Sequence, residues 1–159
     1  MTGLNLAQFK NEVVAPALSH IGLDEDAAVN LLTGTAMAES GLAYMRQFHG
    51  PALGLWQMEP FTHDDIWETF LSDDRLSLLR GAVLDLAARW PARVTQLSGN
   101  LPYACAMARL KYYRALGPLP DVGDAAAQCR YWKANYNTTL GAGEADTPHI
   151  ALFQQAIEA

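Results

Sequence analysis

A carboxylate and a carboxamide, Glu39 and Gln57, have the clearest potential for chemistry in this sequence. Glu39 closes an apolar run with helical spacing, and Gly41 predicts that the helix ends there. The negative end of a helix macrodipole and apolar neighbours both disfavour an ionised carboxylate. We therefore expect a raised pKa for Glu39, as a general acid requires near neutral pH. Gln57 can donate and accept hydrogen bonds with the amide groups of a sugar.

A lone glutamate at a helix end is usually a solvated surface residue, so the surrounding motifs decide its interpretation. Glu39-Ser40 is followed by Gly54-Leu55-Trp56-Gln57, and then by Pro60 and Thr62. This order resembles the lytic transglycosylases of the soluble, lysozyme-like type, which usually have Gly-Leu-Met-Gln at the second motif. That family also has an Ala-Tyr-Asn triplet on a later helix, and this chain has Ala134-Asn135-Tyr136-Asn137.

The resemblance extends from about Leu31 to Gly143, and the chain departs from the family within it. The family commonly has Asn-Pro shortly after Glu-Ser, where this chain has Ala43-Tyr44, and often a serine at the position of Phe48. The late motif contains Asn135 as an apparent insertion. The residues around this motif are more similar to a phage-encoded branch than to bacterial housekeeping enzymes.

The resemblance implies an enzyme that cleaves the β-1,4 bond between N-acetylmuramic acid and N-acetylglucosamine in peptidoglycan. Glu39 would act alone, first as the acid that protonates the leaving oxygen and then as the base. The 6-hydroxyl of the sugar would attack C1 and give a 1,6-anhydro product, which avoids the second carboxylate of most glycosidases. No cofactor or metal is implied.

The resemblance also implies substrate-binding roles for five residues, namely Ser40, Trp56, Gln57, Tyr136 and Asn137. For Ser40, ending the helix is an equal alternative. Trp56 offers either a flat face for a sugar ring or a buried core side chain. Tyr136 either hydrogen-bonds near Glu39, with Asn137 in support, or is an ordinary core tyrosine.

Three other functions remain open from the sequence. A water in place of the 6-hydroxyl would make the protein a lysozyme. Loss of activity would leave a lysozyme-like structural or binding protein of a phage particle. A chitinase-like hydrolase needs a second carboxylate, for which the candidates are Glu59, Asp64 and Asp65. The sequence predicts Glu59 to be exposed and the two aspartates to be first-turn helix charges.

Composition and charge limit the class of partner. The chain has 159 residues, of which 50% are hydrophobic and 18% charged, as in an ordered globular domain. The net charge of -6 and the pI of about 5.0 argue against nucleic acid as a partner and against electrostatic capture by an anionic cell envelope. Binding to peptidoglycan would therefore depend on a shaped groove or on delivery by another protein.

The remaining polar residues do not suggest a metal site. Cys105 and Cys129 fall on separate predicted helices without zinc-type spacing, so two buried free thiols are expected, and one disulfide is the alternative. His49 and His63 have no ligand partner nearby in sequence. The basic residues of the helix near position 110 are predicted to be solvated, and these are Arg109, Lys111 and Arg114.

No signal peptide or membrane-spanning run is evident in the sequence. We therefore expect synthesis in the host cytoplasm and no membrane insertion. Action on peptidoglycan would then need a holin-type pore or carriage within a phage particle, together with its virion proteins.

The periodicity of apolar residues predicts an all-α, single-domain, lysozyme-like fold over residues 1–159, with six to eight helices. A first amphipathic helix is expected to kink or end near Pro16, and Gly34 is expected to permit close packing against another helix. The only plausible β structure is a small hairpin over Leu53 to Met58. The later helices are expected at Glu25–Ser40 with Asp24 as N-cap, after the cap Thr62, from Asp73 to Trp90 after the cap Ser72, at Tyr103–Leu116, after the cap Asp121, and at Thr147–Ala159. A mobile turn is expected at Gly141–Gly143.

Overall fold

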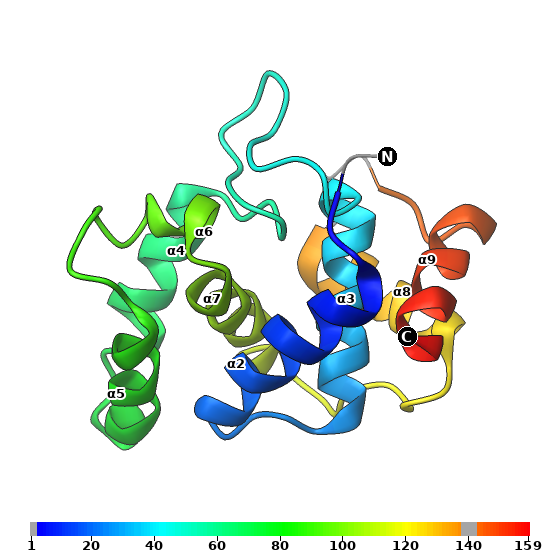
Figure 1. The fold of residues 1–159 in the computed structure, drawn as a ribbon. Helices are drawn as coiled ribbons and strands as arrows, with labels where there is room; N and C mark the ends of the chain where they lie inside the picture. The colour runs from blue at the N-terminus through cyan, green and yellow to red at the C-terminus, as the bar shows by residue number, and fades with distance from the viewer. Residues whose placement is uncertain (1–2, 138–142) are drawn as a thin grey trace.

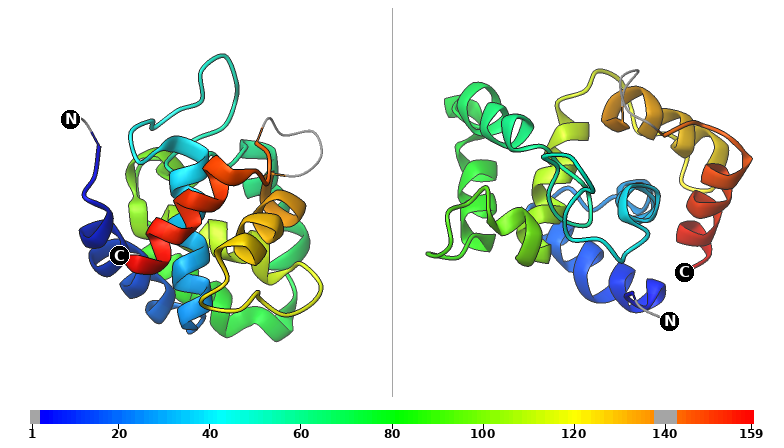
Figure 2. Two further views of the ribbon diagram at one scale, coloured as in Figure 1. Left: turned by 90° about the vertical axis from the view of Figure 1, so that its right-hand side faces the viewer. Right: turned by 90° about the horizontal axis from the view of Figure 1, so that it is seen from above.

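Helix α3 (Asp26–Ser40) runs through the middle of the molecule, and helices from both halves of the chain pack around it (Figures 1 and 2). The computed structural model describes residues 3–137 and 143–159, and within them the regular structure is helical, apart from two isolated β-bridges. The prediction of an all-α single domain is therefore confirmed. Most residues of α3 are buried on every side, as expected of a central helix.

The C-terminal end of α3 agrees with the prediction, and its N-terminal cap does not. Gly41 adopts a left-handed conformation with φ 59°, and its N–H bonds to the carbonyl of Met37 at 2.9 Å. The predicted helix end at Ser40 is thus confirmed, because glycine adopts this conformation without a Cβ penalty. The predicted N-cap is wrong, since the capping position is held by Glu25 rather than Asp24, and no side chain caps the helix there.

Gly34 is where α3 meets the last helix, α9 (Thr147–Glu158). A Cβ atom on Gly34 would lie 2.3 Å from Cδ1 of Phe153, so the ring packs directly on the α3 backbone. The expected close packing at this glycine is confirmed. Thr147 does begin α9, and the side chain of Asp146 caps it by accepting a bond from the His149 N–H at 3.1 Å.

The N-terminal segment is one bent helical run of α1 (Leu6–Phe9), a π-helical turn η1 (Lys10–Val14) and α2 (Ala15–His20). Pro16 lies in the first turn of α2, directly after the π-helical turn, so the helix continues in an altered geometry rather than ending. The run is tied to α9 because Lys10 Nζ donates to the carbonyls of Ala156 and Ile157 at 2.7 and 3.2 Å.

The middle of the chain forms a second group of helices on the other side of α3 (Figure 1). Its members are α4 (Pro60–Asp65), the π-helical η2 (Ile66–Phe70), the 3₁₀ turn η3 (Asp74–Leu76), α5 (Ser77–Leu86), α6 (Gln96–Gly99) and α7 (Leu101–Tyr113).

Several predicted boundaries in this group are wrong. The first helix begins at Pro60 rather than after a Thr62 cap, because proline suits the first turn. Asp73, rather than Ser72, caps η3 through a bond from the Arg75 N–H at 2.9 Å. The helix expected to reach Trp90 ends at Leu86.

A buried polar network joins α4 and η2 to α7. Trp67 Nε1 donates to the Tyr103 hydroxyl at 2.9 Å, and that hydroxyl lies 2.7 Å from Nε2 of His63. The Tyr103 proton is therefore donated to His63, whose Nδ1–H is left to bond to Asp64 at 2.8 Å. Burial lowers the pKa of His63 and raises the pKa of Tyr103 to about 12, so both side chains are neutral members of the core.

The loop between α3 and α4 projects beyond the helices (Figure 1). The hairpin expected over Leu53 to Met58 is reduced to a bridge between those two residues, with a second bridge from Leu53 to Arg46. Gly54 fixes this loop against α6, because a Cβ atom there would lie 1.8 Å from the carbonyl oxygen of Leu97. The glycine that begins the Gln57 segment is thus a packing requirement.

Helix α8 (Ala125–Trp132) continues into the π-helical η4 (Lys133–Asn137), which ends the first described range of the chain. The predicted cap Asp121 is wrong, since Asp124 caps α8 by accepting from the Ala127 N–H at 2.8 Å. The mobile turn predicted at 141–143 lies largely outside the described residues. Cys105 on α7 and Cys129 on α8 are buried free thiols, as predicted.

The contact at Gly34 gives the first prediction. Gly34→Ala forces a methyl group into the Phe153 ring and should lower the free energy of unfolding by about 1–3 kcal/mol. Gly81→Ala is the control, because a Cβ atom at Gly81, inside α5, would have no neighbouring atom within 4 Å. It should raise stability by up to about 1 kcal/mol, because alanine is the better helix former. Urea denaturation measures both; equal effects would contradict the close packing of α3 and α9.

Candidate active site

Glu39 lies on the last turn of α3, where the C-terminal part of the chain returns to it. Its Oε1 atom accepts a bond from Trp132 Nε1 at 2.9 Å and a longer one from Asn137 Nδ2 at 3.4 Å. The donors come from the end of α8 and from η4. Within the described residues, Oε2 accepts no hydrogen bond, so one carboxylate oxygen is not engaged there.

The electrostatic setting of Glu39 favours the protonated carboxyl. Burial is the largest effect and raises the pKa of Glu39 above its ordinary value. The hydrogen bonds from Trp132 and Asn137, followed by the charges of Lys111 and His149, act in the opposite direction without reversing it. The expected direction is confirmed, and burial against the later helices is the cause.

Trp132 is a residue of this site that the sequence analysis missed. Its indole is buried, and His149 stacks on it with ring centroids 5.2 Å apart and an interplanar angle of 24°. Phe153 also packs on the indole, with ring centroids 6.0 Å apart. The available signal was its position, one helical turn before Tyr136 in the late motif.

Lys111 was also missed, because it was predicted to be solvated. The side chain is partly buried, with Nζ 2.5 Å from the carbonyl oxygen of Tyr136 and 4.1 Å from the centroid of the Tyr136 ring. The prediction is wrong for Arg109 as well, whose buried guanidinium bonds to the carbonyl of Leu23 and pairs with Glu25 at 3.3 Å.

Tyr136 lies beside the site but directs its hydroxyl elsewhere. The ring is buried, and the hydroxyl donates to the carbonyl oxygen of Trp56 at 2.8 Å. Tyr112 packs against the same ring at 5.2 Å. Tyr136 therefore joins η4 to the Gln57 segment, and its neighbour Asn137 makes the contact with Glu39.

Trp56 takes the second of its two expected roles, that of a core residue. Its side chain is 1% exposed, its Nε1 donates to the carbonyl of Leu32 at 2.9 Å, and Phe9 packs on it at 5.4 Å. A ring buried in this way has no free face for a sugar. The expectation of sugar stacking at Trp56 is corrected accordingly.

Ser40 and Gln57 both make local hydrogen bonds. Ser40 is buried; its hydroxyl donates to the carbonyl of Ala36 at 2.9 Å and accepts from the Leu42 N–H at 3.2 Å, so it ends the helix. Gln57 is partly buried with φ 45°, and its Nε2 donates to the carbonyl of Gly54 at 2.8 Å. Its side-chain oxygen is not used in that bond.

The candidate second carboxylates are engaged or lie at the surface. Asp64 bonds to His63 at 2.8 Å, and Asp65 forms an ion pair with Arg114 at 2.6 Å. Glu59 is exposed, as predicted, and its charge acts on Lys111. In the part of the chain that the structure describes, none of these three side chains hydrogen-bonds to Glu39.

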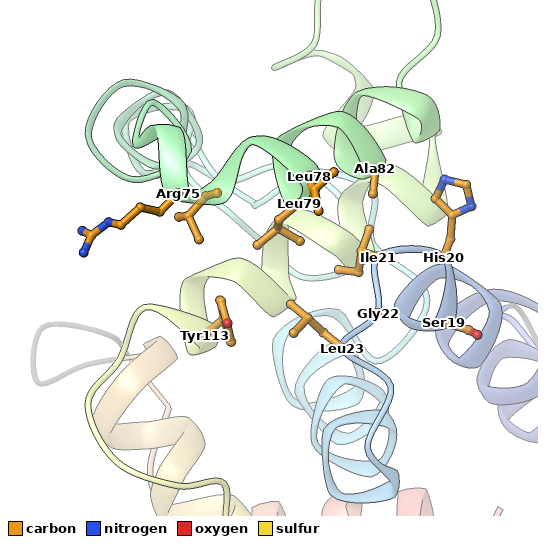
Figure 3. Close-up of a pocket in the computed structure, with 11 residues that line it drawn as sticks. Ser19, His20, Ile21, Gly22, Leu23, Arg75, Leu78, Leu79, Ala82 and Tyr113 are labelled. Atoms are coloured by element: carbon orange, nitrogen blue, oxygen red, sulfur yellow. The ribbon is translucent and has the colours of Figure 1, made fainter.

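Two hollows elsewhere on the surface are not lined by Glu39. One of about 450 Å³ lies between the end of α2, α5 and the end of α7, with an apolar wall that includes Leu79 and Ala82 (Figure 3). Its charged group Arg75 pairs with Asp73 at 2.6 Å. The other, of about 540 Å³, lies beside Trp90. Neither brings together groups suited to acid–base chemistry.

Comparison of the chain with protein-family models, with curated proteins and with solved structures finds no match. The described residues contain no group of three or more His, Cys, Asp or Glu side chains that could hold a metal ion. No helix within 3–137 or 143–159 is both long and apolar enough to cross a membrane. The geometry around Glu39 is therefore the basis for a functional assignment.

The raised pKa of Glu39 makes a prediction about stability. A group whose pKa is raised by folding stabilises the fold fully below its unfolded pKa, and this contribution is lost as the pH rises through its folded pKa. Glu39→Gln removes the titration but keeps an oxygen acceptor for Trp132. The melting temperature of the variant relative to wild type should therefore increase as the pH rises above about 4, the ordinary pKa of a glutamate.

Glu68→Gln is the control for this measurement, because Glu68 is an exposed glutamate on η2 outside the site. Thermal melts of the three proteins across the pH range measure the effect. A difference between Glu39→Gln and wild type that is independent of pH would show that folding does not raise the pKa of Glu39.

Proposed function

We propose that this chain is a peptidoglycan lytic transglycosylase in which Glu39 is the single acid and base. The observation that supports this most is the setting of Glu39 at the end of α3. One oxygen is held by Trp132 and Asn137, the other accepts no bond from the described residues, and burial raises the pKa. A general acid benefits from a raised pKa and from an oxygen that is not already engaged in a hydrogen bond.

In the proposed reaction, protonated Glu39 donates its proton to the oxygen of the β-1,4 bond as the C1–O bond breaks. The carbonyl oxygen of the substrate's N-acetyl group bonds to C1 and holds the intermediate. Glu39, now ionised, takes the proton of the 6-hydroxyl while the oxygen of that hydroxyl attacks C1 and displaces the acetamido oxygen. Glu39 is protonated again, no water is consumed, and the product carries a 1,6-anhydro ring.

The protein's role in this reaction is to hold the Glu39 carboxyl group in place in both of its protonation states. The Trp132 indole N–H is a donor in either state, so it keeps Oε1 in place while Oε2 exchanges the proton. The engagement of Asp64 and Asp65 supports a mechanism without a second carboxylate. A hydrolytic lysozyme, in which water replaces the 6-hydroxyl, uses the same geometry.

A second candidate is a lysozyme-like structural or binding protein of a phage particle. It is favoured by the placement of two expected substrate-binding side chains, Ser40 and Trp56, which are buried. The net charge of -6 also disfavours direct capture by an anionic cell wall. For either candidate, we propose that access to the wall depends on a virion or on a holin-type pore.

The test is clearing of purified sacculi by wild type, Glu39→Gln and Glu59→Gln. Loss of the only acid should lower the rate of Glu39→Gln by at least about 100-fold. Glu59→Gln is the matched control, since Glu59 is an exposed glutamate whose charge acts on Lys111, and this variant should retain most of the activity. Clearing by Glu39→Gln at the wild-type rate would end the assignment, and an inactive wild type would favour the second candidate.

A further inference from the structure

The ammonium group of Lys111 is partly buried and has no ion-pair partner among the described residues, which is unusual for a lysine. Lys111 lies on α7, and within the described residues no carboxylate lies within 4 Å of its Nζ atom. Its contacts are the carbonyl oxygen of Tyr136 at 2.5 Å and the face of the Tyr136 ring at 4.1 Å. A buried charge without an ion-pair partner is costly, so its retention needs a reason.

Lys111 contacts the residue next to one of the groups that hold Glu39. The carbonyl oxygen of Tyr136 accepts the bond from Lys111, and Tyr136 directly precedes Asn137, whose amide donates to Oε1 of Glu39. The Tyr136 hydroxyl is fixed on the carbonyl of Trp56 at 2.8 Å, so this tyrosine cannot easily turn away. Lys111 is thereby anchored on the backbone that positions the carboxylate.

Several charged or titratable groups surround Lys111 and Glu39. The charges of Lys111 and of protonated His149 act on Glu39. Lys133 Nζ donates to Oδ1 of Asn137 at 3.0 Å. Lys111 is acted on by Glu39 and Glu59, which are opposite charges, and by Arg114 on its own helix. The nearby phenols of Tyr112 and Tyr136 are buried and neutral.

We propose that Lys111 is a positioning residue whose fixed positive charge stabilises the Glu39 carboxylate that forms when Glu39 gives up its proton. This inference rests on the proposed function, because only an acid that later acts as a base must occupy both states. A buried carboxyl without a cation nearby would resist ionisation. A direct ion pair would keep Glu39 ionised, so that it could not donate a proton. A cation held on Tyr136 instead allows Glu39 both to donate a proton and to take one up.

The mutual effects of the two groups agree with this arrangement. Burial lowers the pKa of Lys111, and the charge of Glu39 opposes that effect; in return, the charge of Lys111 opposes the rise in the pKa of Glu39. Such coupling is reciprocal, so removing either group must shift the titration of the other.

The test is the NMR titration of the Glu39 carboxyl in wild type and in three variants, together with the pH profile of sacculus clearing. Lys111→Met should move the Glu39 midpoint upward by about 1 pH unit, and the pH profile should move in the same direction. Lys111→Arg retains the charge and should restore the wild-type midpoint. Arg80→Met is the matched control, because Arg80 also donates to a backbone carbonyl, that of Leu71 at 2.7 Å, but does not act on Glu39.

An unchanged Glu39 midpoint in folded Lys111→Met would overturn the proposal, even if activity were lost, because loss of activity alone is a structural effect. If Lys111→Met does not fold, the reciprocal measurement decides. Glu39→Gln should lower the midpoint of the Lys111 ammonium group, and an unchanged midpoint would refute the coupling. If the midpoints shift in the variants but the wild-type protein leaves sacculi intact, the proposed function would be refuted and the coupling upheld.

Discussion

The hydrogen bond from the Trp132 indole to the Glu39 carboxylate is the interaction on which the candidate site depends. It joins residues 93 positions apart and closes the C-terminal part of the chain over the end of α3. The same contact creates the burial that raises the pKa of Glu39, while its donor limits how far the pKa rises. A carboxylate buried without this donor would be an unpaired charge, and one exposed to water would be an ordinary surface glutamate.

The position of Trp132 depends in turn on how α9 packs. His149 and Phe153 of α9 pack against the indole, and Phe153 also packs on Gly34 in the middle of α3. A glycine that is remote from the chemistry in sequence is therefore part of its support, since a side chain there would push Phe153 and the indole away. The anchoring of Lys10 on the last carbonyls of α9 fixes the other end of the same helix.

Sequence alone could predict what local rules determine and missed what tertiary packing determines. The end of α3 at Gly41 and the close contact at Gly34 follow from the special geometry of glycine, and both were predicted. The helix starts were less predictable, because several neighbouring polar residues can cap equally well and packing chooses among them. Trp132 and Lys111 carry no local mark of their roles, since an indole or an ammonium group gains its function from a partner that is distant in sequence. The same holds for Trp56, where an aromatic residue in a motif has the same appearance whether its ring is free or buried.

In the proposed mechanism one carboxyl, without a partner carboxylate, serves as acid and then as base for a nucleophile within the substrate itself. Mass spectrometry of the muropeptides released from purified sacculi tests this most directly. Attack by the 6-hydroxyl predicts fragments that end in 1,6-anhydro residues, lighter by one water (about 18 Da) than the hydrolytic products. Fragments with only reducing ends would contradict attack by the 6-hydroxyl and show that the protein delivers water to the bond instead.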